Sequence, residues 1–182
     1  MKFAVWIFSV AMAFQVHVAA DEVANPLYMP WKGSPGKTVT INRIENIYGG
    51  APMPGGGARI LPPKPVTYTL TSLDSSGATL KVTTSPNQPA ETLFIPSSLS
   101  SDDPSLPKPS GTEDLKISDK TYHCTKYTYL STSKAELGRD PQGFSAHVTV
   151  WIADEVPGGI VRRQIGLTIR VSYDITDTLA LK

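Results

Sequence analysis

Apolar and polar residues alternate with a period of two along much of the chain, and no stretch keeps the 3.6-residue period of an amphipathic helix. The clearest alternation covers residues 161–175. Its apolar parity comprises Val161, Ile165, Leu167, Ile169, Val171, Tyr173 and Ile175. We predict one strand here, with one face buried and the other in water. Arg163 is the charged exception on the apolar parity, and we place it at the open end of this strand.

The preceding segment, Phe144–Ala153, alternates in the same way and is predicted to form a hairpin with that strand. The connection contains the type II turn sequence Val156-Pro157-Gly158-Gly159, in which Gly158 takes a positive φ. If Val156 faces Gly159, three cross-strand pairs follow: Ile152 with Arg163, Val150 with Ile165 and Val148 with Leu167. This register places both apolar faces on the same side of the sheet.

Further strands are expected upstream. They cover Lys37–Tyr48, Pro65–Leu73, Ala78–Thr84, Glu91–Ile95, Asp114–Ser118 and Thr121–Ser131. A change of parity at Asn42–Arg43 predicts a β-bulge, and Asp74–Gly77 and Asp119–Lys120 read as hairpin loops. Residues 49–65 and 96–111 are rich in Gly, Pro and Ser and are predicted to be long loops. The fold class is therefore mostly β, an antiparallel meander of about eight strands forming a curved sheet (a half-barrel) or a small sandwich.

Residues 1–20 have the pattern of a secretory signal peptide. Lys2 precedes the apolar run Phe3–Phe14, and small residues follow at positions 18–20. A transmembrane anchor is the alternative, but the run is short and Gln15 and His17 follow it. We expect a signal peptide at 1–20, then a single β domain at 21–182, exported to the periplasm or the extracellular space.

The charge of the chain argues against two classes of partner. The sequence has 17 Lys and Arg against 16 Asp and Glu, so the counts become equal once Lys2 is removed. The longest basic run is Arg162–Arg163. Nucleic acids and anionic membrane surfaces need concentrated positive charge, so neither is expected to bind. Separately, we expect no transmembrane segment in the domain after signal cleavage.

Cys124 is the single cysteine, which excludes an intrachain disulfide. We expect it to be a small buried hydrophobe. His123 should face the opposite side of the same strand, and pairing the strands through Ser131 and Phe144 would put Cys124 opposite Trp151, away from His147. No metal-ligand spacing, nucleotide loop or nucleophile motif is found, so we expect no cofactor, no metal site and no enzyme, with catalysis by Cys124 kept as the third reading.

Aromatic residues on the predicted strands are the candidate binding residues. They are Tyr122, Tyr127, Trp151 and Tyr173. Such side chains either pack across neighbouring strands or line a concave sheet that holds an apolar ligand. Both readings stay open at this point.

Two stretches, Lys120–Cys124 and Thr149–Val161, together resemble a hairpin found in exported bacterial proteins of unknown function. There, a strand with a lone cysteine precedes a strand with tryptophan, an acidic E-V-P-G-G turn and a return strand. The resemblance covers Leu115–Arg163. Such proteins look distantly like the half-barrels of periplasmic lipoprotein carriers and receptors, which would imply a carrier of apolar ligands.

The leading hypothesis is thus a non-catalytic exported β domain that binds an apolar or amphiphilic ligand, such as a lipid. The alternative is an envelope-associated structural or protein-interaction module without a small ligand. A solvent-open concave face lined by Val150, Ile165, Leu167 and Ile169 would favour the carrier, and a filled interior would favour the module.

Overall fold

The structure is a computed structural model. It describes residues 21–32, 37–48, 59–84, 88–139, 141, 143–168 and 172–180. The expected signal peptide at 1–20 and most of the expected loop at 49–65 lie outside the described residues.

Antiparallel strands make up most of this part of the chain, which confirms the predicted fold class. The strands are β1 (Glu22–Ala24), β2 (Thr38–Tyr48), β3 (Arg59–Ile60), β4 (Lys64–Leu73), β5 (Gly77–Thr83), β6 (Glu91–Pro96), β7 (Ser98–Ser100), β8 (Lys108–Ile117), β9 (Lys120–Ser131), β10 (Ala146–Ile152), β11 (Ile160–Thr168) and β12 (Ser172–Leu179). A 3₁₀ turn, η1 (Met29–Trp31), and a short helix, α1 (Lys134–Leu137), complete the elements.

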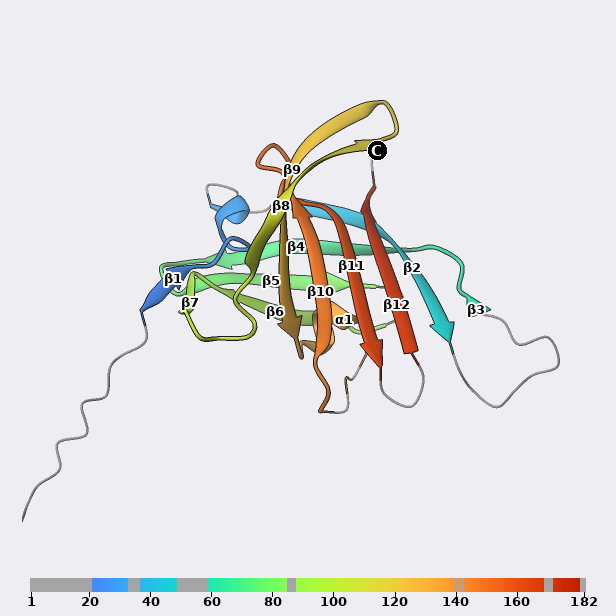
Figure 1. Cartoon of the computed structure of the whole chain (residues 1–182), viewed down its shortest axis with the longest axis horizontal. Coiled ribbons are helices and arrows are strands. Elements are labelled where there is room, and N and C mark those ends of the chain that lie inside the picture. The colour runs from blue at the N-terminus through green and yellow to red at the C-terminus, as the bar shows by residue number, and fades with distance from the viewer. Residues whose placement is uncertain are drawn as a thin grey trace, which may run out of the picture.

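One large sheet runs in the order β6-β5-β4-β2-β12-β11-β10-β9-β8, with β3 added beside β2, and β1 and β7 form a separate ribbon. The central pair β12–β2 joins the last strand of the described chain to its first long strand. The sheet is not closed into a barrel. It bends so far that β4, β5 and β6 run across the direction of β10, β11 and β12 (Figure 1).

The β10–β11 hairpin has the predicted turn but not the predicted register. Gly158 has φ +71°, and the Gly159 amide donates to the Val156 carbonyl at 2.8 Å. The strands, however, pair Val150 with Arg163, two residues away from prediction. A second turn, in which the Val156 amide donates to the Ala153 carbonyl, ends β10 early and pairs Ile152 with Ile160. A β-bulge between Trp151 and Ile152 then gives a shift of two residues along the rest of the hairpin. The shift is even, so the inward face is preserved.

The predicted strand over residues 161–175 is in fact two strands, β11 and β12. Ile165 pairs with Ile175 across them, so the alternation continues through the reversal. No Gly or Pro marks the connection at residues 169–171, which lie outside the described part. Arg163 lies in the interior at 1% exposure, so its predicted position at the open end of the strand is wrong.

Strand β2 is regular where a bulge was predicted. Its buried parity continues from Ile41 through Arg43 and Glu45, and Ile44 faces outward at 36% exposure. The apparent change of parity arose because two charged residues occupy inward positions. Both have partners supplied by distant segments, which makes their burial possible.

Hairpins with compact local signals match prediction. Asp74 Oδ1 accepts from the Ser76 amide at 2.8 Å and so closes the β4–β5 turn. The β8–β9 hairpin forms as predicted, but its turn lies at residues 118–119, one residue before the predicted Asp119–Lys120 loop. The segment 96–111 is less of a loop than predicted, since it contains β7 and the start of β8. The edge position of β8 tolerates Pro109, which has no amide hydrogen.

Two buried apolar clusters fill the fold. One joins η1, β4 and β5 to β8, β9 and the β10–β11 turn, and includes Trp31, Leu80 and Cys124. The other lies on β10, β11 and β12 around Val150 and Ile165. Among the described residues, no helix has the length and apolar character needed to cross a membrane.

Candidate functional site

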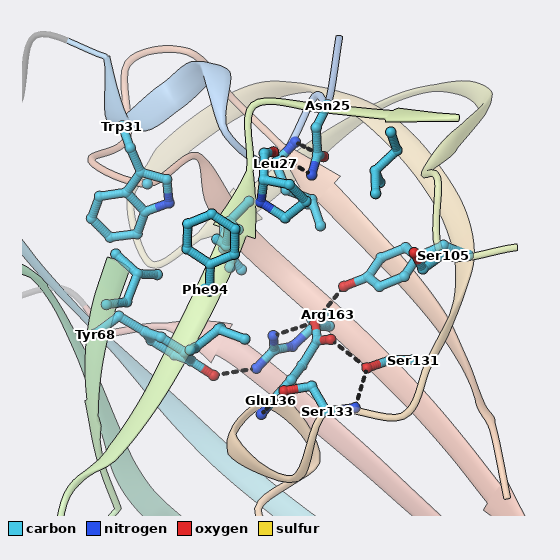
Figure 2. A pocket seen from close by; sticks show the side chains of 18 of the residues that line it. Asn25, Leu27, Trp31, Tyr68, Phe94, Ser105, Ser131, Ser133, Glu136 and Arg163 are labelled. Carbon is cyan, nitrogen blue, oxygen red and sulfur yellow. Dashed lines mark hydrogen bonds and ion pairs between the residues drawn. The ribbon is translucent and has the colours of Figure 1, made fainter. Parts of the chain in front are cut away.

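The bent sheet has two arms, one formed by β4, β5 and β6 and the other by β9, β10 and β11. A cavity of about 230 Å³ lies between these arms (Figure 2). Its apolar walls come from η1, β5, β6 and β11, and include Trp31, Leu80, Leu93, Ile95 and Ile160. Polar groups gather at the opposite side, which we call the floor: Tyr68, Tyr129, Ser131, Glu136 and Arg163. An apolar cavity with a few convergent polar groups is typical of small-molecule sites.

The N-terminal segment forms one wall of the cavity. The Asn25 amide donates to Ser97 and its side-chain nitrogen donates to Pro96, at 2.9 and 3.0 Å, so the segment is fixed against the end of β6. Trp31 is then buried against Gly158, whose missing side chain leaves room for the indole. A Cβ at Gly158 would lie 2.4 Å from the Trp31 ring.

The cavity reaches the surface beside Phe94. This residue lines the cavity and is 51% exposed. Leu27 and Leu99, which are half-buried, also line it. Figure 2 shows Phe94 between Leu27 and Tyr68, so a ligand entering there would meet apolar side chains first.

Arg163 is the centre of the floor. Its guanidinium donates to Glu136 at 2.9 Å and to Asp177 at 2.6 Å, and it also donates to the Tyr68 hydroxyl. The Tyr129 hydroxyl donates to Glu136 Oε1, and Ser131 donates to Oε2 at 2.7 Å. The bond from Arg163 to Tyr68 spans 95 residues, whereas Tyr129 and Ser131 are only seven and five residues from Glu136.

A second arginine balances the charge behind the floor. Arg43 donates to both carboxylate oxygens of Asp177, at 2.8 and 2.9 Å, and to the Glu136 carbonyl. Two arginines therefore face two carboxylates, and the cluster is neutral overall. All four side chains are at most 9% exposed, so each depends on the others for its counterion.

Helix α1 places Glu136 in the floor. Ser133 caps its N-terminus by accepting from the Glu136 amide, and this turn carries the Glu136 side chain back towards β9. Lys134 bonds to Glu91 of β6 at 3.2 Å and so links α1 to the other arm of the sheet.

The electrostatics of the floor follow from burial and charge pairing. Burial would raise the pKa of Asp177, but Arg163 and Arg43 together lower it. Burial would lower the pKa of Arg163, but Tyr68, Asp177 and Glu136 raise it well above its usual value. Burial and the Glu136 charge raise the pKa of Tyr129. Arg163 and Asp177 therefore both stay charged, and the phenol of Tyr129 stays protonated.

None of the four aromatic candidates lines this cavity. Tyr122 and Trp151 are buried in the first apolar cluster, where the Trp151 indole donates to Glu113 at 2.7 Å. Tyr127 and Tyr173 are half-buried against the second cluster, and the Arg139 guanidinium lies 3.7 Å from the centre of the Tyr173 ring. The structure does not bring them together.

Cys124 is fully buried, and its pKa is raised to about 11 by burial and by Glu155, Asp114 and Glu113. His147 pairs with Leu130, six residues along β9 from Cys124, a separation of roughly 20 Å. The β9–β10 register pairs Ser131 with Ala146, so the predicted Ser131–Phe144 pair, and with it the alignment of Cys124 with Trp151, is wrong.

The described part of the chain contains no group of three or more His, Cys, Asp or Glu residues arranged to hold a metal ion. Comparison with known protein families finds no family that matches, and comparison with curated proteins finds no match either.

Sequence reasoning missed Tyr68, Glu136 and Arg163 as site residues. One signal was present: Arg163 stands on an apolar parity, and a charge at such a position calls for a buried partner. Nothing local indicates that this partner lies on α1 and β12.

Proposed function

We propose that this protein is a non-catalytic exported β domain that binds a small amphiphilic ligand in the cavity between the arms of its sheet. The observation that carries the proposal is the cavity itself, with apolar walls, a polar floor and an exposed phenyl ring at its opening. Export rests on the sequence pattern of residues 1–20.

The size of the cavity limits the ligand. A cavity of about 150 Å³ holds benzene, so 230 Å³ suits roughly ten non-hydrogen atoms by the same measure. That is a medium-length hydrocarbon chain with a small head group. A full diacyl lipid would extend far past Phe94.

The interior of the sheet over β10 and β11 is filled with side chains, which bears on the alternative function. Val150, Ile165 and Leu167 are at most 2% exposed, so the concave surface expected from sequence is not open over β10 and β11. Binding is proposed only for the cavity beside β5 and β6. The filled interior over β10 and β11 favours the second candidate, a protein-interaction module.

A specific feature supports that second candidate. Strand β8 is at the edge of the sheet, and its residues 108–114 are all exposed. A free edge can accept a strand from another protein. A partner that protects the β8 amides from hydrogen exchange, with no effect on the cavity, would favour this module.

Catalysis by Cys124 is the third candidate function. A nucleophilic thiol needs a lowered pKa and access to substrate. Cys124 has a raised pKa and no exposed surface.

The test is native mass spectrometry of the mature protein purified from its own envelope. We expect a bound small molecule that leaves on denaturation. Leu93→Trp should fill the cavity and abolish this mass. Leu73→Trp is the matched control, because Leu73 is also a partly buried leucine packed on the first cluster but does not line the cavity. A bare mass, together with no change in tryptophan emission when amphiphiles of eight to ten carbons are added, would contradict the proposal.

A further inference from the structure

The hydrogen-bonding capacity left over on the floor specifies the head group of the ligand. We infer that the cavity selects an amphiphile with an uncharged oxygen head group, an alcohol or a ketone, which accepts a hydrogen bond from the Tyr68 hydroxyl. This inference rests on the proposed function, because it names the ligand class of the same cavity.

The first step concerns charge. Among the residues lining the cavity, the charged ones are Glu136 and Arg163, and these two form an ion pair at 2.9 Å. Behind them Asp177 and Arg43 form a second pair. A carboxylate or ammonium head group would lose its hydration and would find no counterion that is not already engaged. A neutral head group loses much less on entering.

The second step concerns donors and acceptors. Asp177 accepts from both arginines, through both of its oxygens. Glu136 accepts from Tyr129, Ser131 and Arg163. The carboxylate oxygens of Asp177 and Glu136 therefore already accept hydrogen bonds from neighbouring side chains.

Tyr68 differs from the other floor residues. Its hydroxyl oxygen accepts from Arg163, and in the described part of the chain its own hydrogen has no acceptor. The side chain is 1% exposed and borders the cavity. A buried phenol that accepts from a guanidinium is a good donor, because the positive charge polarises its O–H bond. The complementary ligand atom is an oxygen acceptor at the end of a hydrocarbon chain.

The third step places the ligand. Tyr68 and Arg163 lie at one side of the cavity in Figure 2, and Phe94, Leu27 and Trp31 lie at the other. The head group would therefore enter deepest, with the chain running along Leu80 and Leu93 towards Phe94. Orientation by one polar group within an apolar cavity is the usual arrangement for small ligands.

The experiment is isothermal titration calorimetry of the mature protein at pH 7.5 with 1-nonanol, nonanoate and nonylamine. These probes share one chain length and differ in head-group charge. We expect nonanol to bind at least about tenfold more tightly than either ion. 2-Nonanone should bind like nonanol, since both offer an oxygen acceptor.

Tyr68→Phe should weaken nonanol binding by about fivefold to tenfold, the effect of one hydrogen bond. Tyr28→Phe is the matched control. Tyr28 is also buried, and its hydroxyl also makes one hydrogen bond, by donating to the Asp74 carbonyl at 2.9 Å, but it does not line the cavity. The affinity of Tyr28→Phe for nonanol should be unchanged, although both variants lose a side-chain hydrogen bond within the protein.

Two results would overturn the inference and leave the proposed function standing: equal or tighter binding of nonanoate, or equal loss of nonanol affinity in both variants. If none of the four probes binds, the proposed function fails together with the inference.

Discussion

The floor and the apolar walls of the cavity are held in place by different forces. In and directly behind the floor, four side chains form a neutral cluster in which every charge has a fixed partner: Arg43, Glu136, Arg163 and Asp177. In the walls, side chains such as Trp31 and Leu80 are held by packing alone. Charge pairs demand one geometry, whereas hydrocarbon packing tolerates small rearrangements. We therefore expect the floor to fix where a ligand sits and the walls to decide how large it can be.

The largest expected effect comes from breaking the floor. Arg163→Met removes a cation and leaves Glu136 and part of Asp177 buried without a counterion, which should lower the free energy of unfolding by about 3–5 kcal/mol. Urea unfolding followed by circular dichroism measures it. The control is Lys134→Ala, which breaks a pair whose side chains are 63% and 36% exposed and should cost about 1 kcal/mol or less. Similar losses in both variants would show that burial of the cluster does not matter.

The next effect concerns the wall at Gly158. Gly158→Ala combines a left-handed φ with a Cβ that would meet the Trp31 ring, so it should cost about 2–4 kcal/mol. Gly143→Ala separates the two causes, because Gly143 has φ +82° but nothing within 4 Å of the added Cβ. That control should cost about 1 kcal/mol. Equal midpoints in thermal unfolding would contradict the close contact with Trp31.

A smaller effect appears in acid. The pKa of Asp177 is lowered by Arg163 and Arg43 against the effect of burial. A group with a lowered folded pKa stabilises the fold above its unfolded pKa, which is 3.8 for this residue, and loses that contribution as the pH falls through the folded value. We expect stability to fall below about pH 4, and to fall less steeply in Asp177→Asn. The exposed Asp74 and the half-buried Asp103 also have lowered pKa values, so this comparison with the variant, and not the slope alone, identifies Asp177.

The smallest expected effect appears at alkaline pH and concerns Cys124 in the first apolar cluster. Burial and nearby carboxylates raise the pKa of Cys124 to about 11, from 9.0. The thiol ionises first in the unfolded chain, so its contribution is complete below pH 9 and is lost as the pH rises towards 11. Stability measured from pH 8 to 10 should decline more steeply in the native sequence than in Cys124→Ala. Identical slopes would show that the thiol is in contact with water.

Local signals in the sequence predict the fold better than the site. The Asp74–Gly77 turn determines its hairpin because its hydrogen bonds close within four residues. The sequence also predicts the Gly158 turn, but the extra turn at Ala153–Val156 shifts the register. Asp154 is a common turn residue, but it directly precedes Val156-Pro157-Gly158-Gly159, so the pattern indicates one turn and not two. Alternation alone could not reveal the reversal between β11 and β12, because facing residues keep the same parity.

The site depends on pairings that no local pattern encodes. Arg43 and Asp177 are 134 residues apart, and Arg163 and Tyr68 are 95 residues apart. At Asn42–Arg43, the inward-facing charge resembled a bulge because its partner could not be known. Position on a strand alone predicts the aromatic candidates, and packing across strands accounts for the burial of Tyr122 and Trp151.

The pairing of β12 with β2 sets the order in which this protein can assemble. Asp177 on β12 neutralises an arginine 134 residues earlier, in β2. Before β12 pairs with β2 and β11, both buried arginines lack this carboxylate, and β2 and β11 each have an unpaired edge. The other strands therefore gain little by folding without β12, and we expect the domain to become stable in one cooperative step that includes this long-range pairing.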